Sequence, residues 1–170
     1  MTSREYAGFL HREAWELMDD MLRLRGVDHS QLRRTGLGKP YIEGSPMHLS
    51  LTHCEGFCAC CLSLSPVGID AEPAGRFSHQ AAKKALTPRE YELVLKNGEQ
   101  VFAGLWTLKE SYIKALGRGI GYGLKNAEFV IDEKGTVLYH PSGAVFRQQK
   151  IGGYIVSAAE LTGKDAEICF

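Results

Sequence analysis

The stretch VGIDAEP, from Val67 to Pro73, has the composition of a strand in a protein core, yet it carries two acids. Side chains of a β-strand alternate between its two faces, so Asp70 and Glu72 point one way and Ile69 the other way. Two carboxylates at this spacing lie about 7 Å apart and can converge on one hard cation such as Mg²⁺. A solvent-facing strand edge with two ordinary acids is the alternative that this stretch alone leaves open.

A predicted helix downstream adds a third acid. The segment EQVFAGLWTLKESYIKALG, residues 99–117, has the strongest helical pattern in the chain and is expected to end at Gly117. At 100° per residue, Glu110 falls just outside the apolar arc, beside Trp106, and Lys114 follows one turn later. An acid and a base therefore lie at the rim of a buried face. The alternative is an exposed Glu–Lys pair that supports the helix by a few tenths of a kcal/mol.

Two more segments have helical patterns. Residues 4–25 are expected to form a helix that ends near Gly26. Residues 78–97 are expected to form two short helices, with Thr87 as the N-cap of the second and Pro88 at its first position. Residues 28–46, rich in Gly and Pro, are expected to be a loop. The apolar face predicted for the first helix consists of Phe9, Leu10, Ala14, Leu17, Met18, Met21 and Leu22.

Short strands account for most of the remaining chain. The runs 47–53, 57–64 and 67–73 are expected to form an antiparallel meander. Helices and hairpins are segregated along the chain and do not alternate as βαβ units, which predicts an α+β protein in one domain. The strands expected after residue 126 are 127–132, 136–140, 144–150, 154–160 and 166–170, with turns at 132–135 and 151–153.

Composition limits the classes of function. The 170 residues include 20 Lys and Arg and 20 Asp and Glu, so no net charge points to nucleic acid or a membrane. No apolar run approaches the roughly 18 residues of a membrane span. The N-terminal residues lack the apolar core of a secretion signal, and we expect the protein to be cytoplasmic.

Four of the five cysteines lie in CEGFCACC, at Cys54, Cys58, Cys60 and Cys61. A zinc site is one interpretation, but the spacing does not match paired C-x-x-C motifs, and Cys169 is far away. The other interpretation is a buried strand that uses cysteine as a small apolar residue, which we favour because free cysteine is among the most buried residue types.

Two further stretches offer groups for a phosphate. In HLSLTHCEG, Thr52 and His53 come at the end of a predicted strand and could donate hydrogen bonds. In GLGKP, Lys39 lies between Gly and Pro in a turn, where its charge suits a phosphate. A structural histidine and a solvated surface lysine are the respective alternatives.

Five stretches, in this order, resemble the 4′-phosphopantetheinyl transferases of the surfactin-synthetase-activating type. They are GKPYI (38–42), HLSLTHCEG (48–56), VGIDAEP (67–73), LTPREYE (86–92) and LWTLKESYIKALGRGI (105–120), and they extend over about half of the chain. Such enzymes transfer the phosphopantetheine arm of coenzyme A to a serine of an acyl or peptidyl carrier protein and release adenosine 3′,5′-bisphosphate. The resemblance implies a monomer made of two similar halves with the site between them. The halves are residues 1–75, which are shortened at the start, and residues 76–170.

The resemblance also implies roles for single residues. Asp70, Glu72 and Glu110 resemble the family's three acids for Mg²⁺, which Mn²⁺ could replace. Lys114 resembles the lysine that contacts the coenzyme A phosphates, and Glu90 resembles a further active-site acid. We expect Glu110 to accept the proton of the carrier serine, with Glu90 as the second choice. The groups that resemble coenzyme-binding residues are Lys39, Thr52, His53, His11 and Arg12, with Arg33 or Arg34 as additional candidates for the 3′-phosphate.

Two other functions stay open at this stage. One is a Mg²⁺-dependent phosphoesterase, such as a pyrophosphatase or nuclease, because three acids and a lysine would serve there too. The other is a protein that binds coenzyme A or a carrier without catalysis. The glycine-rich loop that contains Arg118 and Lys125 is a candidate contact region for the carrier protein. The alternative is that this loop is a plain connector.

Overall fold

Helices and strands were assigned in a computed structural model of the chain, which describes residues 2–132 and 136–162. The helical elements are α1 (Ser3–Arg23), η1 (His29–Gln31), α2 (His79–Ala85), α3 (Pro88–Asn97), α4 (Glu99–Leu116), η2 (Ile120–Tyr122) and η3 (Leu124–Asn126). The strands are β1 (Leu32–Arg34), β2 (Pro40–Ile42), β3 (His48–Cys54), β4 (Phe57–Ser63), β5 (Val67–Pro73), β6 (Val130–Ile131), β7 (Val137–Tyr139), β8 (Ala144–Ile151) and β9 (Tyr154–Leu161). All described ladders are antiparallel, which confirms the α+β class.

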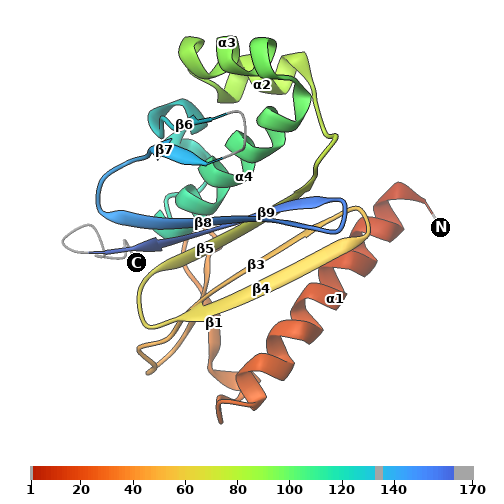
Figure 1. Cartoon of the computed structure of the whole chain (residues 1–170). Coiled ribbons are helices and arrows are strands. Elements are labelled where there is room, and N and C mark those ends of the chain that lie inside the picture. The colour runs from red at the N-terminus through yellow and green to blue at the C-terminus, as the bar shows by residue number, and fades with distance from the viewer. Residues whose placement is uncertain (1, 133–135, 163–170) are drawn as a thin grey trace.

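Helix α1 lies along the β3–β4 hairpin (Figure 1). Thr2 and Glu5 form a capping box at its start, which satisfies two of the free backbone N–H groups there. The prediction that Phe9 and Leu17 belong to the buried face is wrong, since they are 38% and 40% exposed. The hairpin covers a narrower stripe than the apolar pattern suggested, and the buried residues of α1 are Leu10, Ala14, Met18 and Leu22.

The segment predicted as a loop, residues 28–46, contains a small hairpin. Strand β1 pairs with β2, and Leu32 lies opposite Ile42. Ile42 is buried with Met18, Leu22 and Leu49, so the hairpin closes the core beneath α1. Strands of three residues are too short to show a two-residue period, and the Gly and Pro between them hid the pairing.

Strand β5 does not continue the β3–β4 hairpin, so the predicted three-stranded meander is wrong. It pairs instead with β9, in a sheet of order β5-β9-β8 that places Asp70 opposite Ser157. Pairing begins where the backbone N–H of Leu161 donates to the oxygen of Pro66 at 2.9 Å. The sheet therefore joins the two predicted halves of the chain.

Helix α4 packs directly on β5 because Gly68 has no side chain. A Cβ atom at Gly68 would lie 2.0 Å from the backbone oxygen of Ser111 and 2.5 Å from the backbone nitrogen of Ala115. The helix ends, as predicted, at Gly117, whose φ of 68° is in the left-handed region that glycine adopts readily. Helices α2 and α3 lie beyond the N-terminal end of α4 (Figure 1), and Thr87 caps α3 as expected.

The hydrophobic core has two separate clusters among the described residues. One lies under α1, and the larger one joins α2, α3 and α4 to β6, β8 and β9. The pseudo-twofold relation of the halves stays a prediction. The expected strand 166–170, with Cys169, lies outside the described residues, and so does most of the turn 132–135. No helix in the described part is long and apolar enough to cross a membrane.

The cysteines of β3 and β4 are free and half-buried. Burial raises the pKa of Cys60 to about 11 and that of Cys61 to about 12. The sulfur of Cys60 lies 3.0 Å from the sulfur of Met21 on α1. Cys60 thus packs the hairpin against α1, in agreement with the use of cysteine as a small apolar residue, but β4 is half-buried where a buried strand was expected.

Candidate functional site

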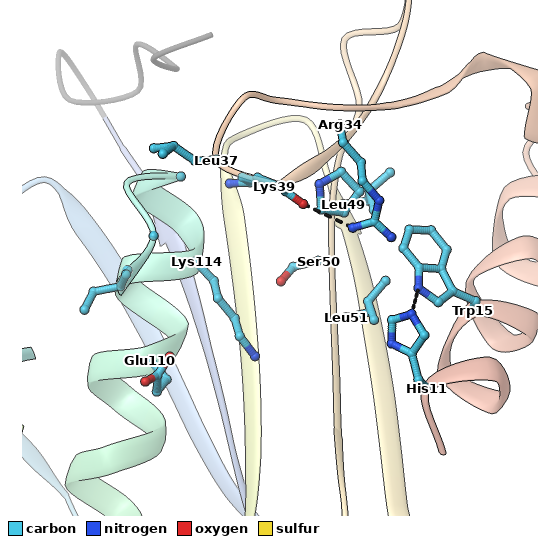
Figure 2. Close-up of a pocket in the computed structure, with 15 residues that line it drawn as sticks. His11, Trp15, Arg34, Leu37, Lys39, Leu49, Ser50, Leu51, Glu110 and Lys114 are labelled. Atoms are coloured by element: carbon cyan, nitrogen blue, oxygen red, sulfur yellow. Dashed lines mark hydrogen bonds between the residues drawn. The ribbon is translucent and has the colours of Figure 1, made fainter. Parts of the chain in front are cut away.

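A cleft lies between α4 on one side and α1 with β3 on the other (Figure 2). It consists of two cavities that share His11, Leu51, Glu110 and Lys114. The acidic cavity, about 350 Å³, is lined by these four residues and by Thr52, His53, Asp70, Glu72, Arg76 and Trp106. The basic cavity, about 370 Å³, is lined by the shared four and, among others, by Trp15, Arg34, Lys39 and Ser50.

One stripe of α4 faces this cleft. From Val101 to Ala115, every residue is buried except Trp106, Glu110 and Lys114. These three follow one another at four-residue steps, so they lie on one side of the helix. The sequence pattern placed Glu110 and Lys114 at the edge of an apolar face. Between Val101 and Ala115 the helix is buried all round except for this stripe, which faces the cleft.

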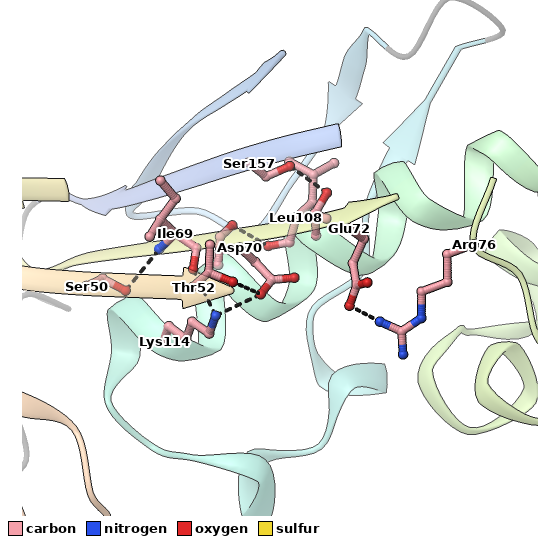
Figure 3. Close-up of polar contacts among 11 residues, drawn as sticks. Ser50, Thr52, Ile69, Asp70, Glu72, Arg76, Leu108, Lys114 and Ser157 are labelled. Carbon is pink, nitrogen blue, oxygen red and sulfur yellow. Dashed lines mark hydrogen bonds and ion pairs between the residues drawn. The ribbon is translucent and has the colours of Figure 1, made fainter. Parts of the chain in front are cut away.

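Asp70 is the most enclosed acid of the cleft. Its Oδ1 atom accepts hydrogen bonds from Nζ of Lys114 at 2.7 Å and from Oγ1 of Thr52 at 3.2 Å (Figure 3). Its Oδ2 atom is buried and has no partner among the described residues. A buried carboxylate oxygen without a donor is costly, so this atom is a candidate ligand atom for a cation.

The carboxylates influence one another across the acidic cavity. Burial raises the pKa of Asp70, against the opposing effect of the Lys114 charge. Burial also raises the pKa of Glu110, and the charge of Asp70 raises it further. Glu110 is therefore poised to hold a proton more readily than an ordinary glutamate.

Glu72, the second acid of β5, is paired with Arg76 (Figure 3). Arg76 follows β5 in the chain, and its guanidinium carbon lies 5.1 Å from the centre of the Trp106 ring. Both acids of β5 are 6–8% exposed. The alternation predicted that both acids lie on one face of β5, and they do line one cavity, but Lys114 and Arg76 cover them, so this face is not open to solvent.

Two histidines line the acidic cavity from the side of α1 and β3. The rings of His11 on α1 and His53 on β3 are 5.4 Å apart and nearly perpendicular. Nε1 of Trp15 donates to Nε2 of His11 at 3.1 Å (Figure 2). Burial lowers the pKa of His53, and the neighbouring His11 and Lys114 add to this effect. The neutral form of His53 is thus favoured near neutral pH.

Lys39 reaches the basic cavity from the turn before β2. Its Nζ donates to the backbone oxygen of Ala115 at 2.8 Å, at the C-terminal end of α4. Burial lowers the pKa of Lys39 to about 8. The ammonium therefore lies between the helix end, whose dipole favours a cation, and the space of the cavity.

Two predicted site residues do not reach the cleft. Arg12 is on the exposed side of α1 and lines neither cavity. Glu90 is 1% exposed and lies in the core, where it pairs with Nζ of Lys109 at 2.8 Å. It also accepts hydrogen bonds from the backbone N–H groups of Thr87 and Phe129. With its oxygens engaged in this way, Glu90 fixes the start of α3 and is not placed to act on a substrate.

The sequence did not identify Trp15 and Arg76 as residues of the cleft, and it did not distinguish Arg34 from Arg33. Arg34 stacks over Trp15, with 5.0 Å from its guanidinium carbon to the ring centre, whereas Arg33 pairs with Glu43 on the surface. Only the four-residue step from His11 to Trp15 hinted that Trp15 faces the cleft. Arg76 follows the end of a strand, where no periodicity applies, and no signal identified it.

The chemistry of the acids suits a divalent cation. Carboxylate oxygens are preferred ligands of Mg²⁺ and Mn²⁺, Asp70 has an unpaired buried oxygen, and Glu72 and Glu110 line the same cavity. Among residues 2–132 and 136–162, however, no three His, Cys, Asp or Glu side chains are gathered closely enough to hold a metal ion. The donors fit the ion in kind, but Glu72 and Glu110 would have to move toward Asp70.

Comparison with known sequences places the central residues in one family. A family model described as the 4′-phosphopantetheinyl transferase superfamily matches residues 66–159, more than half of the chain. A 4′-phosphopantetheinyl transferase of Bacillus subtilis is 34% identical over 105 residues, 59% of this chain and 47% of that protein. A relative from Aneurinibacillus migulanus, the 4′-phosphopantetheinyl transferase gsp, is 28% identical over 137 residues, 76% of this chain and 57% of that protein. The chain thus spans about half the length of these relatives.

Solved structures give a partial likeness. The holo-(acyl-carrier-protein) synthase of Thermotoga maritima has a TM-score of 0.48 and 25% identity, covering 59% of this chain and 64% of that one. The Helicobacter pylori synthase, solved in complex with coenzyme A, has a TM-score of 0.45 and 20% identity, covering 56% of this chain and 99% of that one.

Proposed function

The chain belongs to the 4′-phosphopantetheinyl transferase superfamily, and on this premise we propose that it transfers the 4′-phosphopantetheine arm of coenzyme A to a serine of an apo carrier protein. The second product is adenosine 3′,5′-bisphosphate. The observation that carries the proposal is the cleft with two joined cavities, acids in one and cations in the other. Asp70, Glu72, Glu110 and Lys114 all lie in the matched segment.

The basic cavity suits the nucleotide end of coenzyme A. Its volume of about 370 Å³ lies in the usual range for ligand pockets. Lys39 and Arg34 supply positive charge for the 3′-phosphate, and the Trp15 ring is an aromatic surface for the base. His11 lies where the two cavities meet, so a ligand that occupies both would pass beside it.

The acidic cavity is where the pyrophosphate and the serine would meet. Bound Mg²⁺, or Mn²⁺ in its place, would supply charge neutralisation and orientation of the pyrophosphate. Asp70, Glu72 and Glu110 are the residues that would hold this ion. Lys114, already fixed by Asp70 and the backbone oxygen of Ile69, is placed to stabilise charge on the leaving bisphosphate.

Glu110 is the proposed proton acceptor. The serine oxygen forms a bond to the phosphorus nearer the pantetheine, the bond from that phosphorus to the bridging oxygen of the pyrophosphate breaks, and the serine proton passes to the carboxylate. Burial and Asp70 raise the pKa of Glu110, which brings its basicity closer to what proton transfer near neutral pH requires. The core position of Glu90 leaves Glu110 as the base.

Several expectations about the protein's surroundings stay predictions. They are a cytoplasmic location, a monomeric state, and the absence of nucleic acid and membrane among its partners. The loop after α4, with Arg118 and Lys125, stays a candidate contact for an acidic carrier protein. Its Arg118 lies over Tyr122, with 5.5 Å from the guanidinium carbon to the ring centre.

One assay tests the function and separates it from its alternatives. The protein is mixed with Mg²⁺, coenzyme A and an apo carrier protein, and the intact mass of the carrier is measured. A gain of one phosphopantetheine group supports the proposal. Hydrolysis of coenzyme A with an unmodified carrier would show a phosphoesterase. Binding of coenzyme A with neither reaction would show a binding protein.

A further inference from the structure

The two acids of β5 each have a cationic partner, and the partners are held differently. Lys114 lies in α4 and donates to the backbone oxygen of Ile69 at 2.9 Å as well as to Asp70. Arg76 lies after the end of β5, and its side chain is 41% exposed, against 31% for Lys114. The more exposed ion pair is the weaker one, so Glu72 is the acid whose partner a ligand can displace at lower cost.

Arg76 has a second contact and free space beside it. Its guanidinium lies over the Trp106 ring, where the attraction between a cation and an aromatic face persists without Glu72. It lines both the acidic cavity and a neighbouring cavity of about 540 Å³, which Cys54, Glu55 and Gly75 also line. Arg76 can therefore leave the carboxylate without entering a packed region.

The charge of Arg76 acts on the other acids as well. Burial raises the pKa of Asp70 and that of Glu110, and the positive charge of Arg76 opposes both increases. The guanidinium of Arg76 thus supplies, together with the ammonium of Lys114, the positive charge of the acidic cavity.

From these contacts we infer that Arg76 is a positioning residue whose place on Glu72 is taken by the divalent cation. In the cation-free protein Arg76 pairs with Glu72. When a cation enters the acidic cavity, Glu72 turns to it, and the released guanidinium shifts across the Trp106 ring toward the neighbouring cavity. The inference rests on the proposed function, because it requires Glu72 to bind the cation.

The direct test is Mn²⁺ binding, measured by the electron paramagnetic resonance signal of free Mn²⁺ without coenzyme A. If Arg76 competes for Glu72, Arg76→Ala should bind Mn²⁺ about two- to fivefold more tightly, as expected for loss of a partly exposed ion pair. Arg76→Lys, which keeps the charge, should stay closer to wild type and covers the case of a misfolded alanine variant. Arg118→Ala, the matched control at the other arginine–aromatic contact, should leave the affinity unchanged.

A second readout follows Arg76 through Trp106. The chain has two tryptophans, so Trp15→Phe leaves Trp106 as the only one. Mg²⁺ should change its fluorescence in Trp15→Phe, and this change should be absent when Arg76→Ala is added. In a Glu72→Gln background, Arg76→Ala should no longer tighten Mn²⁺ binding, because the acid for which they compete is gone.

The outcomes separate the inference from the function on which it rests. Wild-type protein that binds Mn²⁺, with Arg76→Ala binding equally or more weakly, overturns the role of Arg76 and leaves the metal site intact. Wild-type protein that binds no Mn²⁺ overturns the metal site and the role of Arg76 together. Transfer of phosphopantetheine without any divalent cation would do the same.

Discussion

Replacement of Gly68 by alanine should separate α4 from β5 and disable the cleft. The added Cβ would lie 2.0 Å from the backbone oxygen of Ser111, whereas ordinary contact begins near 3.4 Å, so helix and strand must part by about 1.4 Å. Overpacking of this kind costs about 1–3 kcal/mol, and each kcal/mol lowers the melting temperature of a chain of this size by about 2–4 °C. A shift of about 1 Å in the reacting groups is expected to lower the rate of transfer by about a hundredfold.

Gly104 provides the matched control on the same helix. A Cβ atom there would meet Gln148 and Ile131 at 3.4 and 3.5 Å, which is ordinary contact. Gly104→Ala should therefore keep the rate of transfer and, because alanine favours helix, raise stability by up to about 1 kcal/mol. The assays are thermal unfolding and the carrier mass assay. If Gly68→Ala melted and reacted like wild type, the direct packing of α4 on β5 would be refuted.

Three further predictions concern single side chains. Glu90→Gln removes the counter-charge of buried Lys109 and should lower the free energy of unfolding by about 3–5 kcal/mol, while the rate per folded molecule stays near wild type; slow transfer by a protein of normal stability would instead restore the predicted catalytic role. Because the pKa of Lys39 is lowered to about 8, its ammonium is lost as pH rises, and the affinity for coenzyme A should fall up to about tenfold between pH 7 and pH 9; calorimetry on Lys39→Met should show weaker binding without this pH dependence. Glu110→Gln should stop transfer but leave coenzyme binding in place, and a normal single-turnover rate would exclude Glu110 as the base.

The parts of the fold that depend on local sequence were predictable. Helix α4 has a long apolar pattern and a glycine stop, and the Thr87 cap with Pro88 after it marks the start of α3. The pairing of β5 with β9 was not predictable, because alternation shows that a segment is a strand and does not identify its partner. Strands β1 and β2 were missed because three residues are too few to show a period.

The same distinction applies to the site. The spacing within VGIDAEP predicted that Asp70 and Glu72 share a face, and the spacing within LKESYIK predicted the same for Glu110 and Lys114, because each pair lies on one element of known periodicity. That the two pairs meet at one site was implied by the family resemblance alone. The ion pair of Glu90 with Lys109 joins two helices and was not visible in either pattern. As a result, a core glutamate resembled a catalytic one.

The central claim is that the acidic cavity carries out phosphopantetheine transfer, and Asp70→Asn tests it most directly. The amide keeps the shape of the side chain, and its oxygen can still accept the hydrogen bond from Lys114. The Lys114 side chain is 31% exposed, unlike the buried Lys109, so it does not become a buried unpaired charge and the variant should stay folded. Wild type and variant are incubated with Mg²⁺, coenzyme A and an apo carrier protein, and the intact mass of the carrier is recorded. We predict a gain of one phosphopantetheine group with wild type and an unchanged mass with folded Asp70→Asn. An unmodified carrier with wild type, or equal modification by both proteins, would contradict the claim.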